Sequence, residues 1–73
     1  MEKKEISTAA IHRLISKAGA ARIGDDAVSE LRKILEDLAV QISRGAWEMA
    51  AHAKRKTVKA EDIRLSAKRF LKE

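Results

Sequence analysis

The sequence contains no cysteine and no proline, and it has only three glycines and two aromatic residues. Without cysteine, disulfide bonds and thiolate metal sites are excluded. The two histidines, His12 and His52, lie far apart and have no ligand-like spacing around them, so we expect no metal and no cofactor. No carboxylate pair, nucleophile–base set or glycine-rich phosphate loop is recognisable, so we expect neither catalytic residues nor enzymatic activity.

Long apolar runs are absent as well. No stretch approaches the length of a membrane span, and no apolar segment follows the charged N-terminus, MEKKE. We therefore expect a soluble, cytoplasmic protein with no membrane partner. The 73 residues suffice for a single domain, covering residues 1–73. Because so short a chain builds only a small core, and disulfides and metals are excluded, a second copy is the simplest source of further stability.

The positive charge is concentrated at the two ends of the chain, and the formal net charge is +5. Residues 1–24 hold five Lys/Arg and two Glu, and residues 54–73 hold eight Lys/Arg and three Asp/Glu. The middle segment holds three Lys/Arg and six Asp/Glu and is acidic. A basic balance indicates an anionic partner, nucleic acid or an anionic membrane surface. A basic membrane helix would not have its basic residues divided between the two ends of the chain. The distribution therefore favours nucleic acid as the anionic partner.

Apolar periodicity and capping residues predict three helices. The first begins at a capping residue, Ser7 or Thr8, and ends before Gly19. The second opens with Asp25 and Asp26, whose negative charge suits the N-terminal end of a helix dipole. The third has Glu61 and Asp62 in its first turn. The predicted ranges are about 8–18, 25–53 and 59–71.

The middle helix is too long for a compact monomer of this size. About 29 residues at 1.5 Å each span roughly 43 Å, whereas a compact chain of this length is about 30 Å across. Val40 and Trp47 lie nearly opposite the main apolar stripe, so the helix is apolar on two sides and one of them needs a partner helix. The main stripe consists of Leu31, Leu35, Leu38, Ile42, Ala46, Met49 and Ala53.

Two segments resemble the archaeal histones, a branch of the histone-fold family: KAGAARIGDD at residues 17–26 and RKTVKAEDIRLSAKRF at residues 55–70. The resemblance covers about residues 9–71 and includes the long helix between the two motifs. It implies an all-α histone fold, short helix–long central helix–short helix, that forms an intertwined handshake dimer. In that dimer the first loop of one chain lies beside the second loop of the other, which brings the basic ends together.

The resemblance also implies how double-stranded DNA is bound, through phosphates and the minor groove and without base-specific contacts. Arg22 is then the arginine that enters the minor groove, and Thr57 from the other chain holds it in place. Arg55 and Asp62 match a structural salt bridge that braces the second loop, so Arg55 is not counted as a DNA contact. The expected DNA-binding residues are Arg13, Lys17, Arg22, Lys56, Thr57 and Lys59.

Dimers of this family join end to end on DNA, so the resemblance implies wrapping, compaction of the chromosome and a superhelical filament. A small residue at Gly19 allows close stacking of successive turns of wrapped DNA. The residues that match the dimer–dimer contact are Met49, His52, Asp62 and Leu65. Lys54 stands where the family commonly has glycine, and Gly45 and Trp47 depart from the family pattern without an assigned role.

Other functions stay open at this level. The main alternative is a histone-fold subunit of a heterodimeric transcription-regulatory complex, and a heterodimer with a paralogue is a further alternative to the homodimer. A helix-turn-helix regulator would need a short helix pair with a tight turn, which a 29-residue middle helix argues against.

Overall fold

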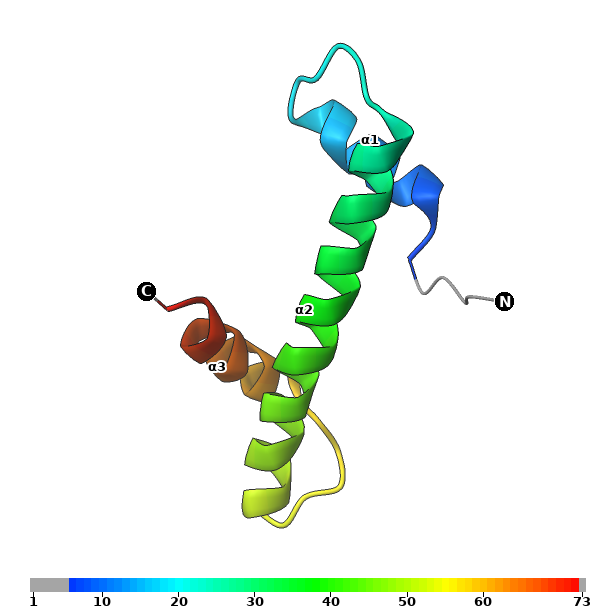
Figure 1. The fold of residues 1–73 in the computed structure, drawn as a ribbon. Coiled ribbons are helices and arrows are strands. Elements are labelled where there is room, and N and C mark those ends of the chain that lie inside the picture. The colour runs from blue at the N-terminus through cyan, green and yellow to red at the C-terminus, as the bar shows by residue number, and fades with distance from the viewer. Residues whose placement is uncertain (1–5, 73) are drawn as a thin grey trace, which may run out of the picture. The chain divides into compact units, whose positions relative to one another are not determined.

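The computed structural model describes residues 6–72, and within them every regular element is a helix. Helix α1 covers Thr8–Lys17, α2 covers Asp25–His52 and α3 covers Ala60–Leu71 (Figure 1). The prediction of an all-α short–long–short arrangement is confirmed. Three helix boundaries differ from the prediction by one residue. Helices α1 and α2 each end one residue earlier than predicted, and α3 begins one residue later. Lys3 and Lys4, which belong to the basic N-terminal segment, lie outside the described residues.

The chain forms two compact units, Met1–Asp37 and Leu38–Glu73, so α2 contributes its first half to one and its second half to the other. In the first unit, Ser7 caps α1 by accepting a 3.1 Å hydrogen bond from the Ala10 N–H. Gly19 ends the helix with a φ of +104°, a left-handed conformation that glycine adopts without steric cost. Ile11 of α1 and Val28 of α2 are buried and form the apolar centre of this unit.

A buried arginine lies in the same unit. Arg32 is only 4% exposed, and its Nη1 lies 3.2 Å from Glu36 Oε1, one helical turn further along α2. The second oxygen of Glu36 accepts a 2.8 Å hydrogen bond from the Ile6 N–H, which ties the segment that precedes α1 to α2. Because burying an unpaired charge is costly, the Arg32–Glu36 ion pair is what allows an arginine here.

In the second unit, α2 ends in a Schellman motif. The Arg55 N–H donates to Ala50 O at 2.9 Å and the Lys54 N–H donates to Ala51 O at 2.9 Å. This geometry places Lys54 in the left-handed region, with a φ of +61°. A residue with a β-carbon is strained there, which explains in physical terms why glycine suits this position.

Lys54→Gly is therefore expected to stabilise the protein by up to about 1 kcal/mol, because it removes the left-handed strain at the end of α2. The change is measured by chemical unfolding at a fixed chain concentration. Lys54→Ala is the matched control, since it removes the same charge but keeps the β-carbon. Equal stability of the two variants would contradict this account of the α2 terminus.

Helix α3 lies close against α2 because Gly45 has no side chain. The buried Ser66 hydroxyl donates a 2.7 Å hydrogen bond to Ile42 O on α2. A β-carbon at Gly45 would collide with Ser66 Oγ. The sequence left Gly45 without a role, and the structure assigns it one in helix packing.

Several large apolar side chains of α2 stay exposed to solvent, among them Ile34, Val40 and Trp47. Val40 and Trp47 are seven residues apart and so lie on one side of the helix. A partner helix that crossed this side of α2 would cover both side chains.

Candidate nucleic-acid interface

The first group of candidate DNA contacts lies in the N-terminal unit. Arg13 and Lys17 are four residues apart on α1 and share one face, and Arg22 lies in the loop between α1 and α2. All three side chains are exposed. Among residues 6–72, none of the three takes part in an ion pair or a side-chain hydrogen bond. Their charges are therefore available to an anionic ligand.

The loop that carries Arg22 is held at both of its ends. The Gly19 N–H donates to Ser16 O at 3.0 Å, and Gly24 O accepts from the N–H groups of Ala27 and Val28 at 3.1 and 3.2 Å. Ile23, next to Arg22, is partly buried. The loop thus turns its apolar residue inward and its arginine outward.

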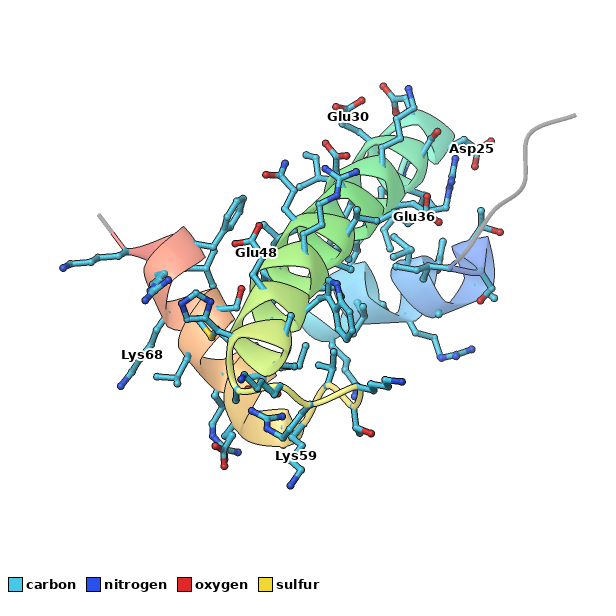
Figure 2. The ribbon with its side chains drawn as sticks, turned by 90° about the horizontal axis from the view of Figure 1, so that it is seen from below. Asp25, Glu30, Glu36, Glu48, Lys59 and Lys68 are labelled. Atoms are coloured by element: carbon cyan, nitrogen blue, oxygen red, sulfur yellow. The ribbon has the colours of Figure 1, made fainter. Side chains whose placement is uncertain are left out.

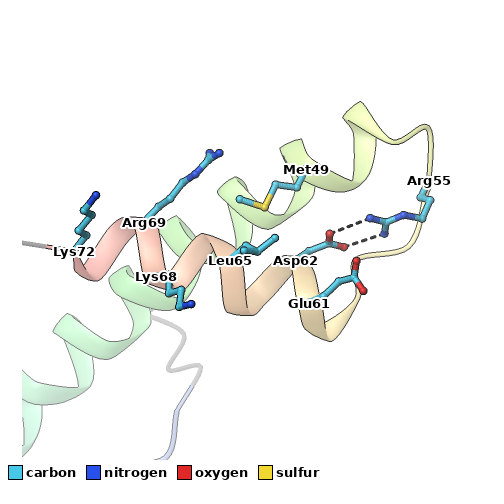
Figure 3. Close-up of a pocket in the computed structure, with 8 residues that line it drawn as sticks. All are labelled: Met49, Arg55, Glu61, Asp62, Leu65, Lys68, Arg69 and Lys72. Carbon is cyan, nitrogen blue, oxygen red and sulfur yellow. Dashed lines mark hydrogen bonds and ion pairs between the residues drawn. The ribbon is translucent and has the colours of Figure 1, made fainter.

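The second group lies between α2 and α3, where Arg55 and Asp62 brace the loop. Arg55 Nη1 donates to Asp62 Oδ2 at 2.9 Å and Nη2 donates to Oδ1 at 3.0 Å, a two-pronged ion pair (Figure 3). The same Nη1 donates to Thr57 O at 3.0 Å. Asp62 Oδ2 also accepts the Lys59 N–H at 2.8 Å, which caps the start of α3.

This network leaves the remaining loop side chains outside. Lys56, Thr57 and Lys59 are exposed, and Lys59 projects away from the helices (Figure 2). Because the backbone beneath them is fixed by the ion pair and the cap, these side chains lose little loop freedom on binding a ligand. Arg55, in contrast, is committed to Asp62 and Thr57.

The surroundings of Asp62 lower its pKa. Its side chain is 3% exposed, whereas that of Arg55 is 28% exposed. The hydrogen bond from Arg55 and the backbone hydrogen bond from Lys59 lower the pKa of Asp62 from 3.8 to about 2, against the opposing effect of burial. The carboxylate is therefore charged throughout the neutral range.

Because the pKa of Asp62 is lower in the folded chain, its ionised form stabilises the fold above about pH 4, and this stabilisation is lost as the pH falls towards about 2. Asp62→Asn is expected to lower the melting temperature at neutral pH, and the deficit relative to the wild type should shrink between about pH 4 and pH 2. Thermal unfolding of both proteins across this range, at one chain concentration, measures the difference. A deficit that stays constant with pH would contradict the assignment.

The residues expected at a dimer–dimer contact surround a groove in the C-terminal unit. Met49, Asp62 and Leu65 line this groove together with Arg69 (Figure 3). His52 lines an adjoining hollow that shares Met49 and Arg69 with the first. Leu65 is 53% exposed, but Asp62 is almost fully buried, so any contact with it must be made through the edge of its carboxylate. At Gly19, a β-carbon would meet no atom within 4 Å.

The sequence-based prediction missed three cations of this groove, Lys68, Arg69 and Lys72. Lys68 and Arg69 lie three and four residues after Leu65 and so share one face of α3 with it, and Lys72 follows directly after the helix. This spacing could have identified the cations from the sequence. The Arg32–Glu36 pair and the contact between Gly45 and Ser66 were missed as well, and only the i, i+4 spacing of the first pair hinted at it.

The two groups of candidate DNA contacts belong to different units of one chain, Arg13, Lys17 and Arg22 to the first and Lys56, Thr57 and Lys59 to the second. Each group is exposed and basic in its own right. Within residues 6–72, no helix is both long enough and apolar enough to cross a membrane.

Comparison with known proteins agrees with this architecture. Residues 4–66 match the family described as histone-like transcription factor (CBF/NF-Y) and archaeal histone. The chain is 52% identical to a subunit of the archaeal histone HAN1 from Thermococcus zilligii over 64 residues, which cover 88% of this chain and 96% of that protein. It is 42% identical to the probable archaeal histone 3 of Methanocaldococcus jannaschii, over 82% of this chain and 90% of the relative. Histone H4 of Entamoeba histolytica is 36% identical over 90% of this chain and 56% of its own length.

The three helices and these matches define a histone-fold protein, and the chain belongs to the family of histone-like transcription factors and archaeal histones. Within that family the chain resembles the archaeal histones, because it is 52% and 42% identical to the two archaeal relatives. Histone-fold proteins of this kind bind DNA and form dimers. The resemblance inferred from residues 17–26 and 55–70 is thereby confirmed.

Proposed function

We propose that this chain binds double-stranded DNA as a handshake homodimer, without reading base sequence, and wraps and compacts the DNA. The observation that carries the proposal is the pair of exposed basic groups, one before and one after the acidic middle segment of the sequence. Cations that have no protein partner are free to neutralise phosphates and release counterions. None of the side chains involved requires a particular base.

The apolar face of α2 supports dimerisation. Val40 and Trp47 are about half exposed and lie on one side of the helix. A second α2 crossing this face would cover them, and burying the exposed half of a large apolar side chain contributes about 1 kcal/mol. A short chain without disulfides gains stability in this way.

In the proposed dimer the first loop of one chain lies beside the second loop of the other. Arg22 enters the minor groove there, and Thr57 of the partner subunit holds the arginine in place. Lys56 and Lys59 contact phosphates from the braced loop, and Arg13 and Lys17 do so from α1. The DNA-binding surface is thus completed only by two chains, which fits the division of the candidate residues between two units.

We further propose that dimers join end to end into a superhelical filament on the DNA, in the cytoplasm and on the chromosome. The contact would use the exposed Leu65, the half-buried Met49, His52 and the edge of the Asp62 carboxylate. The open space beside Gly19 would let successive turns of DNA stack closely.

A second function has its own support. The family description names transcription factors beside archaeal histones, and one relative is named as one of the subunits of its histone. A histone-fold subunit that pairs with a different chain, a paralogue or a regulatory protein, would share the fold described above. It would differ in needing that second chain before it binds DNA.

Titration of the purified chain alone into duplexes of unrelated sequence separates the two functions. The proposal predicts similar affinities for all duplexes and a steep salt dependence, with a slope of log K against log salt of roughly −5 to −9 for the five basic contacts of each chain. Lys33→Ala, which removes an exposed cation outside both groups, should leave the slope unchanged. Binding that appears only after a second histone-fold chain is added would favour the regulatory subunit.

A further inference from the structure

The groove beside α3 has a basic rim around an apolar floor. We define the α3 groove by these residues of its lining: Met49 of α2, then Glu61, Asp62, Leu65, Lys68 and Arg69 of α3, and Lys72 just after α3 (Figure 3). All of them belong to the C-terminal unit. Adjoining hollows beside Gly45 and Phe70 share Met49 and Arg69 with it, so the groove continues along α3.

The charge of the rim is positive because its buried acid is already neutralised. Asp62 is bound by both nitrogens of the Arg55 guanidinium, so neither of these two residues contributes a free charge. Glu61 is then the remaining acid of this lining and Glu48 lines an adjoining hollow, and both are set against Lys68, Arg69 and Lys72. Among residues 6–72 these three cations take part in no ion pair.

The floor of the groove is apolar and open. Leu65 of α3 is 53% exposed, and Met49 of α2 lines the groove with it (Figure 3). DNA would pair its phosphates with the cations, but it would leave Leu65 and Met49 uncovered. A ligand that suits both parts of the groove needs an apolar stripe flanked by carboxylates.

We propose that the α3 groove binds an acidic amphipathic helix of another protein. Apolar side chains one turn apart on that helix would cover Leu65 and Met49, and its carboxylates would face Lys68, Arg69 and Lys72. Helix-in-groove binding of this type uses apolar anchors at spacings of three and four residues, with charge complementarity at the rim.

The α3 groove overlaps the surface proposed above for the contact between dimers. The acidic helix and a second dimer would cover the same Leu65, so only one of them binds at a time. If dimers join through this surface, as proposed above, a bound acidic helix would limit the length of the filament. Binding of the acidic helix to a dimer itself requires neither DNA nor a filament.

Fluorescence anisotropy with the full-length protein tests this binding. The probe is a labelled helical peptide of about 16 residues, with leucines one turn apart and glutamates on both sides of them. The comparison peptide keeps the leucines and carries lysines instead of glutamates. We expect saturable binding of the acidic peptide, weaker by about tenfold in Leu65→Ser and several-fold in Lys68→Glu.

Two matched variants on α3 serve as controls. Leu71→Ser removes a leucine that is 60% exposed but does not line the groove, and Arg64→Glu reverses an exposed charge outside the lining. Both should bind the acidic peptide within about twofold of the wild type.

Four results would overturn the proposal. Equal binding of the lysine peptide, or unchanged binding in Leu65→Ser, would show attraction without use of the groove. Failure of the acidic peptide to bind, together with weaker duplex binding by Lys68→Glu, would assign the surface to DNA. Failure to bind, together with loss of tetramers in Leu65→Ser by sedimentation, would assign it to a second dimer.

Discussion

Arg22→Ala is expected to lower the affinity for duplex DNA on the order of 100-fold, because a homodimer loses two charged contacts of about 1.5 kcal/mol or more each. Arg22 is exposed and free of any protein partner within residues 6–72, so its removal should not disturb the fold. The salt dependence should also become shallower, by about one unit of slope for each arginine removed. Titration of duplex DNA at several salt concentrations measures both effects.

Arg44→Ala is the matched control for this experiment. Arg44 is an exposed arginine of α2 that belongs to neither basic group. Its removal changes the net charge by the same amount but should alter the affinity far less. An equal loss of affinity in both variants would mean that DNA binding depends on net charge alone. The assignment of Arg22 to the minor groove would then be wrong.

Gly45→Ala is expected to destabilise the protein by about 1 kcal/mol, although alanine is the better helix former. Alanine should gain about 1 kcal/mol in helix propensity, but its β-carbon would collide with Ser66 Oγ. Ser66 is buried and hydrogen-bonded to Ile42 O, so moving it breaks that bond or shifts α3 away from α2. Such overpacking costs about 1–3 kcal/mol, which outweighs the propensity. Chemical unfolding at a fixed chain concentration gives the difference.

Combining Gly45→Ala with Ser66→Ala distinguishes a collision with the Ser66 hydroxyl from a general effect of alanine on the stability of α2. Ser66→Ala removes the hydroxyl, so adding it to Gly45→Ala should restore stability close to that of the wild type. The two substitutions should therefore be strongly non-additive, with a coupling of about 1 kcal/mol or more. Simple additivity would mean that Gly45 is only a tolerated weak point in the helix.

Local features of the chain were predictable from the sequence because neighbouring residues determine them. A cap at Ser7 or Thr8, which the structure places at Ser7, and a helix end at Gly19 follow from preferences that act within one turn. The order and type of the three helices follow from the spacing of apolar residues. The differences of one residue at helix ends reflect where the last hydrogen bonds form, which spacing alone does not determine.

Features that depend on residues distant in sequence were not predictable in the same way. Gly45 resembled a defect because its reason lies in Ser66, 21 residues further along the chain. Arg32 was given no role from the sequence, yet it is buried beside Glu36. Lys54 could be marked as a departure from the family, but the left-handed backbone that explains it is visible only in the structure.

The candidate DNA contacts were selected by their resemblance to a family, and the structure adds their surroundings. It shows that Arg22, Lys56 and Lys59 are exposed, and that the loop of the latter two is fixed by Arg55 and Asp62. The pairing of Arg22 with Thr57 requires a second chain, and so stays a prediction. The cations of the α3 groove were overlooked because they match no DNA-binding motif.

Nuclease digestion tests the central claim most directly. The purified chain is bound to long random-sequence DNA and treated with micrococcal nuclease. The account predicts a ladder of protected fragments with small, regular increments, as dimers are added stepwise along wrapped DNA, and it predicts loss of this ladder in Arg22→Ala. Uniform digestion with no protected fragments would contradict it and leave the chain as a subunit that binds DNA only together with another protein.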